Sequence, residues 1–141
     1  YARIDWGQLL ANLNGERDLS RRTVEGFLRA AVVAIPTGKQ NSFAAQNPPN
    51  FLLGVVRNDG VGWSLANAFE RPVTAYRDSG FVRPSIEALD SYWAQLTSKF
   101  PQRLVAVAVL DLEDGTALKS LGQHLKPDLD SWIEALIAPL A

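Results

Sequence analysis

Residues 51–57 read FLLGVVR, a short apolar run that contains two adjacent valines. Pro-Pro-Asn precedes the run and Asn-Asp-Gly follows it. An apolar, partly β-branched run between turn-forming residues is typical of a strand buried on both of its faces. The run RLVAVAVL at residues 103–110 has the same character. We therefore predict two buried strands, at residues 51–57 and 103–110.

Apolar residues recur at helical spacing before the first of these strands. We expect a strand at residues 1–6 and a short helix over residues 5–15, which Asp5 caps and Gly15 ends. A long helix is predicted to begin with Ser20 as its N-cap and to end at Pro36. The inward side chains of this long helix are predicted to be Val24, Phe27, Leu28, Ala31, Val32 and Ile35.

Two further helices are predicted in the second half of the chain. A short helical turn is expected at residues 64–72, and residues 73–83 have no clear period. Pro84 is typical of the first turn of a helix, and a terminal helix begins at Pro127 or Asp128. Two tryptophans on the apolar faces of these helices, Trp93 and Trp132, are predicted core residues.

The order of these elements defines the expected fold class. Helices alternate with strands along the chain, which indicates an α/β (α+β) fold with helices packed on one small mixed sheet. The pattern does not separate parallel from antiparallel pairing. A chain of 141 residues, 47% of them hydrophobic, is enough for one globular domain, so we predict a single domain over residues 1–141.

Composition excludes several kinds of function. The chain has no cysteine and a single histidine, His124, which excludes disulfides and thiolate metal sites and leaves little for histidine chemistry. The longest apolar run, residues 104–110, is too short to span a membrane, so we expect no membrane partner and a cytoplasmic location. The chain has no methionine, even at position 1, and we expect it to be a piece of a longer polypeptide.

Carboxylates gather at residues 111–114 and 128–130, but they lack the regular ligand spacing of a calcium loop. A solvated turn and a helix start, where carboxylates favour the helix dipole, explain them better. No Ser or Cys near His124 comes with an acidic partner that would suggest a catalytic triad, and we interpret His124 as a solvated side chain. We therefore predict no metal, no cofactor and no catalytic group.

The polar segment at residues 35–50 reads IPTGKQNSFAAQNPPN and is unusually long for a connection within one domain. It does not match a nucleotide-binding P-loop, because Val33 stands where the first glycine is required and Gln40 where Ser or Thr is required. Its polar side chains can instead donate hydrogen bonds to phosphates or sugar hydroxyls, beside an aromatic ring that could stack on a base. The residues concerned are Lys39, Gln40, Asn41, Ser42 and Phe43.

The irregular stretch before Pro84 contains Arg71, Arg77 and Arg83, which could also face RNA. A structural alternative stays open for both segments. In that alternative the amides tie down the loop's own backbone, Phe43 anchors the loop, and the arginines pair with Glu70 and Asp78. From the residues alone we favour this structural alternative over RNA contact.

A family resemblance adds to this interpretation. The blocks AIPTGKQNSFAAQNPPNFLLGVVR, SLANAFERPV and GFVRPSIEALDSYW occur in this order and spacing, and YARIDWGQLLANL precedes them. Together they resemble the repeated backbone subunit of the type I-E CRISPR surveillance complex Cascade, the CasC family. The resemblance covers residues 1 to 99 and is weak beyond residue 100.

The resemblance implies an RRM-like (ferredoxin-like) palm, of which this chain would be the C-terminal portion, without the first half of the palm and the finger. It also implies a non-catalytic subunit that grips guide RNA (crRNA) as a filament of copies, beside other Cascade subunits. Target DNA would then be reached through the guide, and a separate enzyme would cleave it. The alternative that we keep is a protein–protein scaffold module with no direct RNA contact.

Residue roles follow from the same resemblance. Family members contact the guide with basic residues just after the ANAFE block, so Arg71 and Arg77 would take this role. Lys39, Gln40 and Asn41 match a family loop that would face either RNA or the neighbouring copy. Together with Ser42, these are the predicted RNA-binding residues.

Overall fold

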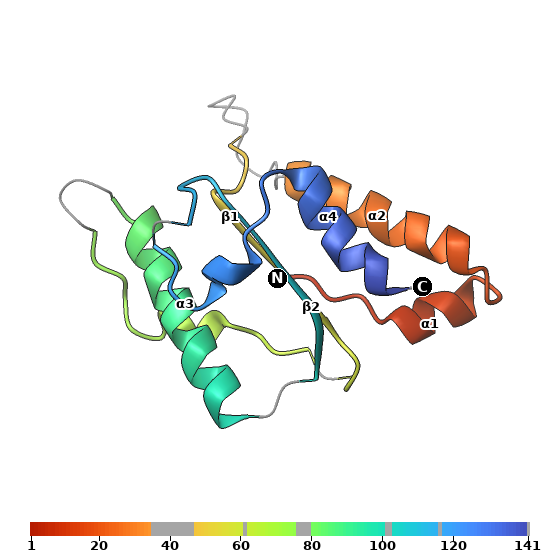
Figure 1. The fold of residues 1–141 in the computed structure, drawn as a ribbon, viewed down its shortest axis with the longest axis horizontal. Coiled ribbons are helices and arrows are strands. Elements are labelled where there is room, and N and C mark those ends of the chain that lie inside the picture. The colour runs from red at the N-terminus through yellow and green to blue at the C-terminus, as the bar shows by residue number, and fades with distance from the viewer. Residues whose placement is uncertain (35–46, 61, 76–79, 101–102, 116, 141) are drawn as a thin grey trace.

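Figure 1 shows the computed structural model, in which helices lie on both sides of a two-stranded sheet. The structure describes residues 1–34, 47–60, 62–75, 80–100, 103–115 and 117–140. The mixed α/β class predicted from the sequence is confirmed. The elements, with η for short 3₁₀ helices, are α1 (Trp6–Asn12), α2 (Arg17–Val33), β1 (Phe51–Arg57), η1 (Ala66–Phe69), α3 (Val82–Lys99), β2 (Leu104–Asp111), η2 (Leu121–His124), α4 (Leu129–Ile137) and η3 (Ala138–Leu140).

The two predicted strands pair with each other. β1 and β2 are antiparallel, with Phe51 opposite Asp111 and an irregularity in register between Val56 and Arg57. On the outer edge of β2, Val109 forms a single parallel bridge with Leu125, and the N–H of Lys126 donates to the carbonyl of Val109 at 2.8 Å. The small sheet is therefore mixed, with one antiparallel pair and one parallel bridge.

Helices cover the central part of both faces of the sheet, whereas Leu104 and Val105 at the start of β2 are 37% and 46% exposed. On one face, Val107 and Val109 of β2 form a core cluster with Trp93 of α3 and Leu121 of η2. On the other face, Ala108 lies in a second cluster with residues of α4. Successive strand residues point to opposite faces, so Val107 and Val109 face the first cluster and Ala108 faces the second. The α4 residues of the second cluster are Trp132, Ile133 and Leu136.

Helix α4 packs against the sheet where the side chains are small. Gly54 of β1 is the cross-strand partner of Ala108 of β2, which is fully buried. A Cβ atom at Gly54 would lie 2.8 Å from Cδ2 of Leu136 and 3.0 Å from Cζ2 of Trp132. The indole N–H of Trp132 donates to the carbonyl of Ala108 at 3.0 Å. Gly54 therefore sets how closely α4 approaches the sheet.

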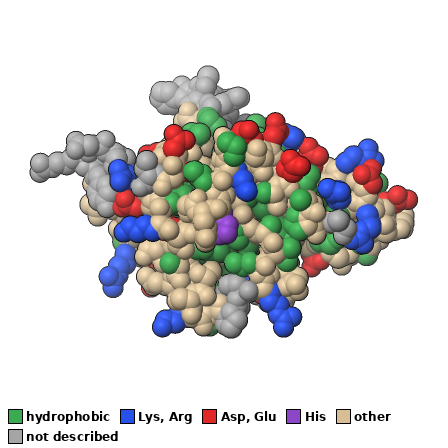
Figure 2. Space-filling model, viewed as in Figure 1, with side chains coloured by type: hydrophobic (Ala, Val, Ile, Leu, Met, Phe, Trp, Pro, Cys, Tyr) green, Lys and Arg blue, Asp and Glu red, His purple; other side chains and the backbone are tan. Residues whose placement is uncertain are grey.

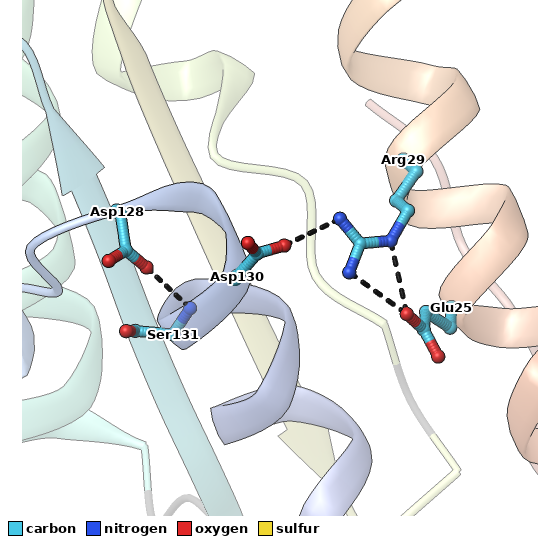
Figure 3. Close-up of polar contacts among 5 residues, drawn as sticks. All are labelled: Glu25, Arg29, Asp128, Asp130 and Ser131. Carbon is cyan, nitrogen blue, oxygen red and sulfur yellow. Dashed lines mark hydrogen bonds and ion pairs between the residues drawn. The ribbon is translucent and has the colours of Figure 1, made fainter.

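An arginine on α2 links this helix to α4 (Figure 3). Nη1 of Arg29 donates to Oδ1 of Asp130 at 2.6 Å, while Nε and Nη2 donate to Oε1 of Glu25 at 3.0 and 2.9 Å. The hydrogen bonds from Arg29 to Asp130 and Glu25 raise the pKa of Arg29. Arg29 therefore keeps its charge at any relevant pH.

Helix α4 begins as the sequence predicted. Asp128 is its N-cap, and the Asp128 side chain accepts a hydrogen bond from the N–H of Ser131 at 2.7 Å (Figure 3). This hydrogen bond lowers the pKa of Asp128, because it favours the charged form of the carboxylate. The predicted core positions Trp93 and Trp132 are 7% and 5% exposed, which confirms them.

The N-terminal predictions are correct only in part. Asp5 caps α1 by accepting from the N–H of Gln8 at 3.0 Å, as predicted. The strand predicted at residues 1–6 is wrong, because residues 1–5 have no regular secondary structure. The alternation of YARIDW lacks a neighbouring strand that could pair with it in the described part of the chain.

The start of the long helix α2 also differs from the prediction. Its N-cap is Glu16, and Ser20 lies inside the helix, where its hydroxyl donates to the carbonyl of Glu16 at 2.8 Å. Gly15 has φ +83°, which lets the chain turn at once after α1, and α2 therefore begins earlier. Phe27, predicted to face the core, is 40% exposed, because α2 buries a narrower stripe centred on Ser20 and Val24.

We expect Gly54→Val to lower the free energy of unfolding by about 1–3 kcal/mol, because the added side chain would overlap Leu136 and Trp132 of α4. Urea unfolding followed by circular dichroism measures the change. Gly26→Ala is the matched control, since nothing lies within 4 Å of a Cβ there and alanine favours the helix by up to about 1 kcal/mol. Equal stability of Gly54→Val and the parent would contradict the close approach of α4.

Candidate nucleic-acid interface

The predicted helical turn after β1 is the 3₁₀ helix η1. Oγ of Ser64 accepts from the N–H of Ala66 at 3.2 Å just before η1, and Leu65 packs against the core cluster between the sheet and α3. η1 itself contacts α3. The predicted turn is confirmed at residues 66–69, and residues 73–75 have no regular secondary structure, as expected. Residues 70–72, predicted to belong to the turn, lie outside the helix. The segment that follows η1 is thus attached to the core through Leu65.

Arg71 is the predicted RNA-binding residue that the structure describes. Arg71 is exposed at the bend that follows η1. The ion pairs found within the described ranges do not include Arg71 or its neighbour Glu70, so the alternative pairing of these two residues is not observed. An exposed guanidinium outside these ion pairs is suited to bind a phosphate, because none of these ion pairs has to break when the phosphate binds.

The other predicted site residues lie outside the described residues. They are Lys39, Gln40, Asn41, Ser42 and Arg77, and their assignment as RNA-binding residues stays a prediction. The same holds for Phe43 and Asp78, on which the structural alternative depends.

Arg83, the third arginine of the irregular stretch, lies inside α3. Its Nε donates to Oε1 of Glu87 at 3.2 Å, one turn further along the helix. α3 begins at Val82, so Pro84 lies in its first turn as predicted. Because Glu87 already neutralises Arg83, this arginine is a weaker candidate for a phosphate contact than Arg71.

A buried carboxylate that the sequence patterns did not single out holds the C-terminal half of the chain to α3. Asp90 is 4% exposed, and its two oxygens accept hydrogen bonds from three consecutive backbone N–H groups. The distances are 3.0 Å to Lys119, 3.1 Å to Ser120 and 2.7 Å to Leu121. The sequence held one signal of this role: Asp90 is an acidic residue beside Leu89, which lies on the apolar face of a predicted helix.

The turn predicted for the carboxylates at residues 111–114 is confirmed, but Asp111 is 5% exposed and not solvated. Oδ1 and Oδ2 of Asp111 accept from the N–H groups of Glu113 and Gly115, each at 3.0 Å, and so close a tight turn. Within the described ranges, no group of three or more His, Cys, Asp or Glu side chains is placed to hold a metal ion.

His124 is half-buried rather than fully solvated. Burial first, and then the charge of Lys126, lower the pKa of His124, since both disfavour the imidazolium form. Among the helices that the structure describes, none is long and apolar enough to cross a membrane.

The solved structures that this fold matches define its class. The chain matches a chain of a "CRISPR RNA-guided surveillance complex" with TM-score 0.85 and 28% sequence identity, over 96% of this chain and 50% of that one. It matches a chain of a "CRISPR RNA-guided surveillance complex, pre-nicking" with TM-score 0.84 and 28% identity, over 98% of this chain and 36% of that one. The predicted resemblance to a Cascade subunit is therefore confirmed, whereas subtype I-E stays a prediction.

The family itself is shown by a sequence model. The model described as CT1975-like protein (Cas_CT1975) matches residues 1–135, so the chain belongs to this family. Comparison with curated proteins gave no match. The chain spans 50% and 36% of the length of the two solved chains.

We expect Asp90→Ala to lower the free energy of unfolding by about 3 kcal/mol or more, because three N–H groups at residues 119–121 would lose a charged acceptor. Amide hydrogen exchange at residues 119–121 should speed up at the same time. Asp18→Ala is the control, since Asp18 is 84% exposed and its ion pair with Arg22 is worth less than about 1 kcal/mol. Unchanged exchange at residues 119–121 would rule out the role of Asp90.

Proposed function

We propose that this chain is the C-terminal portion of a Cascade backbone subunit that binds guide RNA and assembles along it as a filament of copies. The observation that carries this proposal is the match, at 28% identity and over 96% of the chain, to a protein of an RNA-guided surveillance complex. In the proposed assembly the subunit meets target DNA only through the guide. Other Cascade subunits are further partners, and the location is cytoplasmic.

The proposed subunit is not an enzyme. In this proposal its side chains position RNA and carry out no bond cleavage, which is left to a separate recruited enzyme. Incubation of the complete subunit with end-labelled guide RNA should leave the RNA intact. The appearance of defined cleavage products that depend on the subunit would overturn this part of the proposal.

The proposed contacts are of two kinds. Arg71 and Arg77 neutralise guide phosphates, and the exposure of Arg71 at the bend after η1 supports its part. Lys39, Gln40, Asn41 and Ser42 supply hydrogen bonds from the polar segment to the ribose–phosphate chain. Phosphate contacts of this kind fix the register of an RNA strand without reading its sequence, which suits a guide whose sequence varies.

In the complete subunit, Arg71→Glu combined with Arg77→Glu should weaken guide RNA binding. The slope of log K against log salt concentration should become shallower by about 1.4 or more, because two phosphate contacts no longer displace counterions from the RNA. Fluorescence anisotropy with labelled guide RNA at several salt concentrations measures both quantities.

The control for charge is Arg21→Glu combined with Arg22→Glu on α2, which changes the net charge by the same amount. Helix α2 lies on the other side of the sheet from α3 and η1. The control should change the salt dependence much less. If the two double variants bound with the same affinity and salt dependence, the assignment of Arg71 and Arg77 would be wrong.

A second candidate function, a protein–protein scaffold with no direct RNA contact, is favoured by one surface. Helix α2 exposes apolar side chains outside its buried stripe: Leu19 is 41% exposed, Phe27 40% and Val33 73%. Exposed apolar residues on one helix suit contact with another protein. Such a scaffold would use α2 and the segment at residues 35–50 to bind neighbouring subunits.

Cross-linking of the assembled complex to labelled guide RNA separates the two functions. In the RNA-binding function, peptides from residues 37–47 and around Arg71 carry RNA adducts. In the scaffold function these peptides carry none, and Phe27→Glu blocks assembly. RNA adducts on these peptides, with normal assembly of Phe27→Glu, would exclude the scaffold.

A further inference from the structure

An arginine at the end of β1 is held between a carboxylate and an aromatic ring. Nε of Arg57 donates to Oδ1 of Asp59 at 3.0 Å, and a second bond joins Nη2 to Oδ2. The guanidinium carbon of Arg57 lies 4.8 Å from the centroid of the Trp63 ring. The Arg57 side chain is only 11% exposed, so it is part of the packed structure and not a surface charge. We call Arg57, Asp59 and Trp63 the Arg57 cluster.

The Trp63 ring of this cluster is contacted by two elements that are far apart in the sequence. Arg57 comes from the end of β1, and Phe100 is the C-cap residue of α3. The rings of Trp63 and Phe100 meet edge to face, with centroids 5.3 Å apart and planes at 83°. A cation–π contact and an edge-to-face contact both depend on how the indole is turned, so together they orient it. Trp63 therefore ties the segment that leaves β1 to the end of α3.

The segment after Trp63 leads directly to Arg71. The structure describes all of residues 63–71, and within them η1 is the one helix or strand. A single 3₁₀ turn is weak by itself, because its hydrogen bonds are few and poorly aligned. The position of η1 therefore depends on its contact with α3 and on two anchors just before it, the buried side of Leu65 and the ring of Trp63.

The charges near this segment show what the Arg57 cluster does not do. Figure 2 shows Lys and Arg side chains along the left and lower edges of the molecule, on the side where α3 lies in Figure 1, whereas Asp and Glu side chains gather along the upper edge. An anionic strand is attracted to the first of these sides. Arg57 adds little to that attraction, because Asp59 already neutralises it. The contribution of Arg57 must therefore be positional.

We propose that the Arg57 cluster positions Arg71 for its contact with a guide phosphate. Arg57 and Asp59 orient Trp63, Trp63 holds the segment that forms η1, and Arg71 follows η1 after one residue. An arginine that is already held in place loses less conformational freedom when it binds a phosphate. This inference rests on the proposed function, in which Arg71 contacts guide RNA, and it adds Arg57 and Trp63 as positioning residues.

The experiment uses the complete subunit and a fluorescent guide RNA, with binding followed by anisotropy. We expect Trp63→Leu to weaken binding about 3- to 10-fold, because the segment with Arg71 must then be ordered on binding. The slope of log K against log salt concentration should become shallower by up to about 0.7, because the phosphate contact of Arg71 is weakened. Trp63→Phe should restore most of the affinity, since phenylalanine keeps an aromatic face for Arg57.

A double-mutant cycle separates positioning from general destabilisation. The effect of Trp63→Leu is measured in the parent subunit and in a subunit that carries Arg71→Gln. If Trp63 acts through Arg71, Trp63→Leu should change the affinity of the Arg71→Gln subunit by less than about 2-fold. A loss of folded protein would instead weaken binding by the same factor in both subunits. Equal losses would therefore overturn the proposal.

Arg57→Lys is a milder second variant, which keeps the test valid if Trp63→Leu disturbs folding. Lysine keeps the positive charge but lacks the planar fork that pairs with Asp59 and stacks on Trp63, so affinity should fall about 2-fold or more. Arg29→Lys on α2 is the matched control, because Arg29 also donates through Nε and Nη2 to one carboxylate, that of Glu25. The control should leave affinity for the guide RNA unchanged.

Failure of the positioning role and failure of the proposed function give different results. If Arg71→Gln weakens RNA binding while neither Trp63→Leu nor Arg57→Lys does, the positioning role is overturned and the proposed function stands. If Arg71→Gln leaves both affinity and salt dependence unchanged, the assignment of Arg71 fails, and the positioning role fails with it. Weaker binding by Arg71→Gln, to which Trp63→Leu adds nothing further, would support both.

Discussion

The fold depends on one constraint, the close contact of α4 with the sheet at Gly54 and Ala108. Gly54 provides no side chain and Ala108 provides only a methyl group, so Trp132 and Leu136 reach the strands directly. The hydrogen bond from Trp132 to the Ala108 carbonyl satisfies the buried indole N–H within the same contact. Because a two-stranded sheet is barely stable by itself, burial of both faces is what makes this sheet possible.

The opposite face of the sheet shows how the candidate interface is supported. Trp93 of α3 packs on that face, and Asp90 on the same helix binds the backbone that leads into η2. η1 also rests on α3, so the segment that carries Arg71 is attached to a helix with two independent anchors. A surface built from short irregular segments needs such support, because loops lack repeating backbone hydrogen bonds of their own.

Local periodicity made most of the helices and both strands predictable. The apolar runs within residues 51–57 and 103–110 indicated strands, although β1 is only partly buried and β2 is buried only from Val107 to Val109 and at Asp111. Asp5 and Asp128 are caps recognisable from residue type. Partners distant in the sequence could not be predicted. Asp90 binds N–H groups about thirty residues away, and Trp63 meets Phe100 through the fold alone. The prediction that Phe27 is a core residue is wrong, because helical periodicity shows which side of a helix could be buried and not whether another element covers it.

The two kinds of contact in the proposed function contribute to RNA binding by different physical means. Arg71 forms none of the ion pairs of the described residues, so in the proposed function its charge acts on phosphates directly and its contribution falls as salt screens it. Arg57, by contrast, is already neutralised by Asp59, so it adds no net charge for a phosphate. The hydrogen bonds proposed for Gln40, Asn41 and Ser42 involve uncharged side chains and respond less to salt. A guide strand held by both kinds of contact would therefore keep part of its affinity at a salt concentration that removes the arginine contribution.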